Sequence, residues 1–110
     1  MSLICHLVRP SDWETALQRR VYRPASLKAE GFIHFSSPTQ LIPSALRHFP
    51  LDQELVVLYV SERKTEKKLK WEAASDGELF PHLYGALYPE DIEFTRFLIR
   101  NPDGNWELVY

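Results

Sequence analysis

The stretch "ELVVLYV", residues 54–60, is the strongest structural signal in this sequence. β-Branched and aromatic residues favour strands, and this run contains three valines and a tyrosine. A strand with one wet face alternates apolar and polar residues, whereas every position after Glu54 is apolar or aromatic. The pattern predicts a strand at residues 54–60 that is buried on both faces.

Other segments around this run have the composition of strands and are bounded by turn residues. Near the C-terminus, the Asp103-Gly104 pair favours a tight turn and therefore a hairpin that ends in a final strand. The strands expected before that turn are "LICHLV" (3–8), "FIHF" (32–35), "LKWEAA" (69–74) and "IEFTRFLIR" (92–100).

Helices are expected mainly in the first half of the chain. One is predicted at residues 11–20, capped by Ser11 or Asp12, and one at residues 36–50, capped by Ser36 or Ser37. A proline inside a helix removes a hydrogen bond, so Pro43 should kink the second helix or divide it.

Two further segments carry no regular pattern of their own. The aromatic segment at 79–89 is expected to be a loop, and the mixed-charge run at 62–70 a solvated loop or strand end. Between the first helix and the strand at 32–35 we expect a loop with one helical turn around residues 26–30.

The order of these elements defines the fold class. Helices in the N-terminal half, strands in the second half and no repeated βαβ spacing favour an α+β fold with a mainly antiparallel sheet. The 110 residues show no break in composition, so residues 1–110 are expected to form a single domain.

Composition excludes several classes of partner. Thirteen basic and fifteen acidic residues give a net charge of -2, which does not indicate nucleic-acid binding. No apolar run approaches the roughly 18 residues of a membrane span, so no membrane association is expected. A single cysteine, Cys5, and the lack of a signal-like segment favour a cytoplasmic location. The oligomeric state is not indicated.

The stretch "GFIHFSSP" (31–38) contains the first candidate site residues. Successive side chains of a strand point to opposite faces. Ile33 and Phe35 therefore share one face, while His34 and Ser36 lie on the other. A histidine in an apolar strand is either a structural residue with a polar partner or part of a site, and we interpret His34 as a site residue.

Four more polar side chains could converge with His34. His6 lies on the first strand and Glu72 on the strand at 69–74, while His82 and Tyr84 are two residues apart in "GELFPHLYG" (77–85). The alternative is that each histidine is structural, with His82 bonded to a nearby carbonyl. No H-x-H, H-E-x-x-H or C-x-x-C spacing is present, so no metal site is predicted.

Five segments together resemble the bacterial family DUF952, a domain of unknown function. They are "ICHLV", "YRPASLKAEGFIHFSSPTQL", "LVVLYV", "LKWE" and "GELFPHLYGAL". Members of that family look similar to the ADP-ribosyltransferase fold, a split α+β sheet that binds NAD in a cleft between two half-sheets. The resemblance implies such a split sheet here.

The resemblance also implies roles for individual residues. His34 and Glu72 would be catalytic, with Glu72 as the acid that holds the reacting ribose. His6 would bind a ribose hydroxyl, and Ser36, His82 and Tyr84 would complete the substrate-binding surface. The sequence departs from the transferase pattern, because Leu7 and Val8 follow His6 where a glycine and a hydroxyl residue are usual, and His34 replaces a tyrosine.

These roles imply a protein that binds NAD or a related nucleotide and transfers or hydrolyses its glycosidic bond. NAD would be a substrate, and no cofactor is implied. One alternative is a non-catalytic module that binds a nucleotide or a peptide. Another is a metal-dependent hydrolase.

Overall fold

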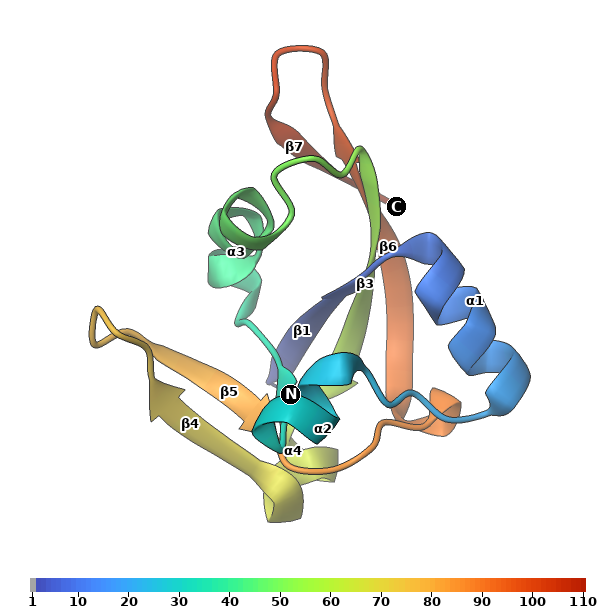
Figure 1. Ribbon diagram of the computed structural model, residues 1–110, viewed down its shortest axis with the longest axis vertical. Helices are drawn as coiled ribbons and strands as arrows, with labels where there is room; N and C mark the ends of the chain where they lie inside the picture. Colours follow the sequence, from blue (N-terminus) through green and yellow to red (C-terminus); the bar gives the residue numbers. More distant parts are fainter. Residues whose placement is uncertain (1) are drawn as a thin grey trace.

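Strand β3 (Glu54–Ser61) is the central element of the computed structural model, which describes residues 2–110. It lies between β1 and β6 in a four-stranded antiparallel sheet of order β1-β3-β6-β7 (Figure 1). The other strands of this sheet are β1 (Leu3–Val8), β6 (Ile92–Arg100) and β7 (Trp106–Val109).

A second, three-stranded antiparallel sheet has the order β2-β5-β4. Its strands are β2 (Ile33–His34), β4 (Leu69–Ala73) and β5 (Leu79–Leu83). The helices are α1 (Pro10–Arg19), α2 (Ala25–Glu30), α3 (Leu41–His48) and the single turn α4 (Glu62–Thr65). Short 3-10 turns occur at Pro38–Gln40, Glu66–Lys68 and Pro89–Asp91.

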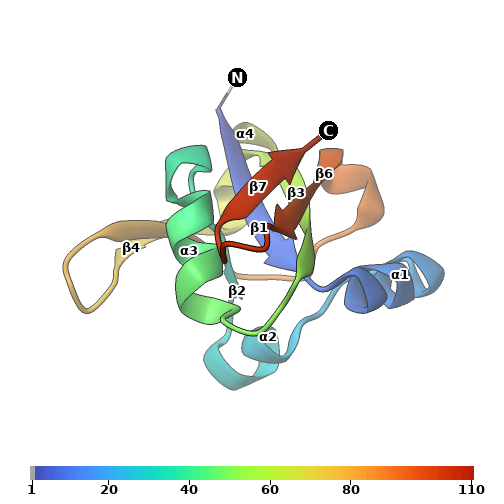
Figure 2. The same cartoon turned by 90° about the horizontal axis from the view of Figure 1, so that it is seen from above.

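Both faces of β3 are buried, as the apolar run predicts. Val56, Leu58 and Val60 pack into a cluster that includes Ala16 of α1. Leu55, Val57 and Tyr59 pack on the other side, with side chains that include Ala45 of α3. Helices α1 and α3 accordingly lie on opposite sides of the four-stranded sheet (Figure 2).

The two sheets are joined where the chain leaves β2. Ser36 and Cys5 exchange backbone hydrogen bonds of 2.7 Å in both directions, which connects the end of β2 to the outer edge of β1. Phe35 donates its N–H to the carbonyl of Pro81 at 3.0 Å, but a proline has no N–H to return the bond. Pairing of β2 with β5 therefore stops at this point, and the chain crosses to β1.

The α+β class, the antiparallel pairing and the strand positions agree with the sequence predictions. One strand was missed, because residues 79–83, expected to be a loop, form strand β5. The charged run is also helical in part, at α4 and the following 3-10 turn, so the helices are not confined to the N-terminal half.

Two helix boundaries also differ from expectation. Helix α1 begins at Pro10, one residue before the predicted start, and neither Ser11 nor Asp12 caps it. A proline is favoured at this first position, where the backbone N–H has no partner in any case. The second predicted helix is divided into a 3-10 turn at Pro38–Gln40 and α3, before Leu41 and not at Pro43, which lies inside α3. Ser37 is the N-cap of the 3-10 turn, and Gln40 accepts the Ser37 N–H at 2.9 Å. No helix within residues 2–110 is long and apolar enough to span a membrane.

Candidate functional site

The outer face of the three-stranded sheet carries a continuous group of polar and aromatic side chains. Residues directly opposite each other in an antiparallel pair share a face. His82 of β5 lies opposite His34 of β2 and opposite Lys70 of β4, so all three side chains lie on this face. We define the outer-face cluster as Glu30, Phe32, His34, Lys70, Glu72, His82 and Tyr84.

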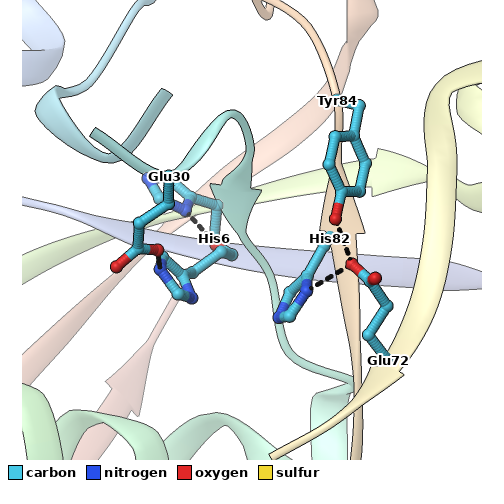
Figure 3. Close-up of polar contacts among 6 residues, drawn as sticks. His6, Glu30, Glu72, His82 and Tyr84 are labelled. Atoms are coloured by element: carbon cyan, nitrogen blue, oxygen red, sulfur yellow. Dashed lines mark hydrogen bonds and ion pairs between the residues drawn. The ribbon is translucent and has the colours of Figure 1, made fainter. Parts of the chain in front are cut away.

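Glu72 lies at one end of the outer-face cluster and accepts two hydrogen bonds on one oxygen. The hydroxyl of Tyr84 donates to its Oε1 at 2.5 Å, and Nδ1 of His82 donates to the same atom at 2.9 Å (Figure 3). These bonds, that of Tyr84 first, lower the pKa of the Glu72 carboxyl because they stabilise its charged form. The hydrogen bond between Tyr84 and Glu72 also raises the pKa of the Tyr84 hydroxyl. Oε2 makes no hydrogen bond within residues 2–110.

His34 lies at the other end of the outer-face cluster and is paired with a second carboxylate. Its Nε2 donates to Oε2 of Glu30 at 2.5 Å, and both side chains are about half exposed. Glu30 is the last residue of α2, and Gly31 after it has φ of 91°, a left-handed conformation that glycine adopts at little cost. This turn brings the end of α2 beside the side chain of His34.

Aromatic rings connect the two ends. Phe32 stacks on His82 with 4.0 Å between the ring centroids and 14° between the planes. The rings of His34 and His82 lie edge to face, with centroids 5.4 Å apart. The ammonium group of Lys70 lies 4.9 Å from the centre of the Tyr84 ring. The outer-face cluster therefore combines two carboxylate–imidazole pairs, stacking surfaces and one nearby cation.

His6 lies beneath this face, in the core. It is buried, its Nδ1 donates to the backbone carbonyl of His34 at 2.5 Å, and its Nε2 accepts the hydroxyl of Tyr22 at 2.7 Å. Burial lowers the pKa of His6 to about 4, so the ring is neutral at pH 7 and the carbonyl fixes which nitrogen is protonated. Both ring nitrogens are used inside the protein, which leaves none for the predicted ribose contact in this arrangement.

Ser36 is also separated from the outer-face cluster. It is buried, and its hydroxyl lies 2.9 Å from that of Ser44 on α3. The alternation that places Ser36 with His34 ends where the chain turns toward β1. Of the six predicted site residues, the fold brings together His34, Glu72, His82 and Tyr84, and places His6 and Ser36 elsewhere.

Three members of the outer-face cluster were not predicted as site residues. Phe32 and Lys70 follow from the same alternation that selects His34 and Glu72. Glu30 carries a different signal, since it lies four residues before His34 at the end of a short helix, directly before a glycine.

Other candidate features lie outside this face. A hollow of about 570 Å³ is lined by residues that include Trp71 and Glu62, and one of about 340 Å³ by residues that include Tyr22 and Arg19. Neither hollow includes a member of the outer-face cluster. No group of three or more histidine, cysteine, aspartate or glutamate residues within 2–110 is arranged to hold a metal ion.

Comparison with known proteins defines the family. Residues 7–95 match DUF952, described as a protein of unknown function, and the chain belongs to this family. The crystal structure of protein CC0527 from Caulobacter crescentus is similar, with 31% identity and a TM-score of 0.88 over 96% of this chain and 94% of that one. The solution NMR structure of CC0527 has 32% identity and a TM-score of 0.83, covering 96% and 91%. No curated protein matches.

Proposed function

We propose that the outer-face cluster binds NAD or a related nucleotide and breaks the bond between nicotinamide and ribose. The observation that carries this proposal is the state of Glu72. Tyr84 and His82 both bond its Oε1, which favours the carboxylate, and its Oε2 is left for a ligand. An ionised acid in this position fits a reaction that develops positive charge.

Cleavage of this bond has the required charge distribution. The electron pair of the bond between C1′ and the ring nitrogen leaves with nicotinamide, which departs neutral, and positive charge develops on the ribose. A fixed carboxylate stabilises that charge most strongly in the transition state. Oε2 of Glu72 would supply this stabilisation.

The neighbouring side chains supply binding contacts of the right kinds. Aromatic faces bind planar bases by stacking, and Phe32 and Tyr84 provide six-membered aromatic rings in the outer-face cluster. Lys70, beside the Tyr84 ring, places a positive charge where a diphosphate would be attracted. These contacts support a nucleotide that carries both a base and phosphate groups.

The exposure of the site favours a second candidate, a binding module that breaks no bond. The outer-face cluster lies on an open sheet face, and the side chain of Glu72 is 39% exposed. Catalytic electrostatics are strongest where water is excluded. A site of this kind would hold the nucleotide by stacking and charge alone.

One experiment separates these functions. NAD is titrated into the labelled protein with amide chemical shifts recorded, and nicotinamide release is followed by chromatography. Glu72→Gln should reduce release about 100-fold or more while NAD still binds. Glu78→Gln, on an exposed glutamate in the β4–β5 turn, is the matched control and should change neither.

The outcomes are distinct. Binding of NAD without release of nicotinamide by the wild-type protein would favour the binding module. Absence of any shift in the outer-face cluster at millimolar NAD would overturn both candidates. Release that Glu72→Gln leaves unchanged would remove Glu72 from the mechanism.

A further inference from the structure

The contact between Glu30 and His34 determines which nitrogen of His34 is free. A carboxylate oxygen only accepts hydrogen bonds, so Nε2 of His34, 2.5 Å from Glu30, must carry the proton. In a neutral imidazole the other nitrogen, Nδ1, then holds the lone pair. Nδ1 makes no hydrogen bond within residues 2–110, and the side chain is 53% exposed. His34 therefore presents an unbonded ring nitrogen to solvent.

The same logic gives His82 a defined orientation. Its Nδ1 donates to Glu72, so Nε2 is its free nitrogen. The two rings lie edge to face, 5.4 Å apart, and each is held by its own carboxylate. Glu72 is already assigned to the developing ribose charge, and the departing nicotinamide needs no proton. The side chain of His34 is 53% exposed and that of His82 only 14%, so His34 is the ring that an attacking group can reach, and its remaining task in the proposed reaction is to take the proton of that group.

We propose that Glu30 is a positioning residue that holds His34 as the base for an acceptor carrying a hydroxyl group. The proposal rests on the proposed function and specifies its acceptor class. An oxygen of water or of an alcohol attacks C1′ of the ribose and forms the new O–C1′ bond. The electron pair of the old bond leaves with nicotinamide, and the hydroxyl proton passes to Nδ1 of His34.

The local structure fits a positioning role. The chain ends α2 at Glu30 with two backbone hydrogen bonds from the Gly31 N–H, to Ser26 and Leu27, so the carboxylate comes from an ordered helix end. His34 is fixed from the other side, because its backbone carbonyl accepts the buried His6 ring. A carboxylate that bonds one nitrogen of an imidazole in this way fixes its tautomer and the orientation of the ring.

The first measurement concerns the hydrogen bond and does not depend on any reaction. Nitrogen-15 NMR of the imidazole rings should show an Nε2–H proton on His34 in the wild-type protein, protected by Glu30. Glu30→Ala should expose this proton to exchange and remove the signal. Glu14→Gln, on an exposed glutamate of α1, should leave it unchanged. Persistence of the signal in Glu30→Ala would overturn the positioning role, whether or not NAD is consumed.

The second measurement concerns the acceptor. With saturating NAD and 10% methanol, the wild-type protein should form ADP-ribose and its methyl glycoside. Glu30→Ala should lower kcat for both about 10- to 100-fold with little change in KM, because in this proposal Glu30 acts through His34 and makes none of the binding contacts assigned to Phe32, Lys70 and Tyr84. A preference for agmatine, a guanidine, over methanol would overturn the hydroxyl class. Failure of the wild-type protein to release nicotinamide would refute the proposed function, and the NMR result would still decide the role of Glu30.

Discussion

His6 and His34 meet at strand β2 from opposite sides, and their surroundings differ sharply. His6 is 8% exposed and uses both ring nitrogens inside the protein, one of them on the backbone of His34. The side chain of His34 is 53% exposed and has one ring nitrogen bonded, to Glu30. The same residue type thus serves a structural purpose in the core, on β1 of the four-stranded sheet, and is available for chemistry on the outer face of the three-stranded sheet.

The difference shows why residue type alone does not define a site. An imidazole in the core must have both nitrogens satisfied, because an unpaired buried polar group is costly. An imidazole on the surface can keep one nitrogen free at no such cost. A candidate histidine is therefore better judged by the nitrogens left unbonded than by its position in a motif.

The largest expected difference between the two histidines is in stability. His6→Ala removes one buried and one partly buried hydrogen bond, leaves the Tyr22 hydroxyl unpaired and opens a cavity, so the free energy of unfolding at pH 7 should fall by about 3 kcal/mol. His34→Ala should cost less than about 1 kcal/mol. Urea unfolding followed by tryptophan fluorescence measures both. Equal decreases in the free energy of unfolding for the two variants would contradict the difference drawn here between His6 and His34.

A smaller effect follows from protonation. The pKa of His6 is about 4 in the folded state, below its ordinary value near 6.5, because burial disfavours the charged ring. Its contribution is complete above pH 6.5 and is lost as the pH falls toward 4, which amounts to about 2 kcal/mol between pH 7 and pH 5. His6→Gln should abolish this pH dependence. The pKa of His48 is also lowered, so His48→Gln is the control variant that separates the contribution of His48 to this pH dependence from that of His6.

The smallest expected effect lies on the outer face. Tyr84→Phe removes the hydroxyl that bonds Glu72, so the pKa of the Glu72 carboxyl should rise toward its ordinary range, while His82 still bonds it. Stability should change little, since the contact is partly exposed. Carbon-13 NMR titration of labelled glutamate measures the shift. An unchanged pKa would show that His82 alone determines the charge of Glu72.

The sequence predicted the strands well where side-chain pattern alone determines them. The run at 54–60 and the alternation from Ile33 to Phe35 depend on burial and on period two, and both are seen in the structure, whereas the alternation fails at Ser36. Strand β5 was missed because Pro81 argues against a central strand. It is tolerated because its missing N–H falls opposite Phe35, where the chain is already leaving for β1.

The side-chain contacts within the site were harder to predict than the face of the sheet on which each residue lies. Alternation places His34 and Glu72 on their strands, but the register that makes His82 the residue between them is a tertiary property. The contact of His6 with Tyr22 spans sixteen residues and depends on the backbone pairing of Tyr22 with Leu87. No local pattern in the sequence contains that information.

Strand β3 is buried on both faces and links the unfolding of the two sides of the core. The two hydrophobic clusters share this strand, so loss of either one exposes a full side of β3 to water. Partial unfolding that removes α1 alone, or α3 alone, therefore destabilises the remaining half as well. The two halves of the core are thermodynamically coupled through a single strand, and the amide protons of Val57 and Leu58 should exchange only when the whole structure opens.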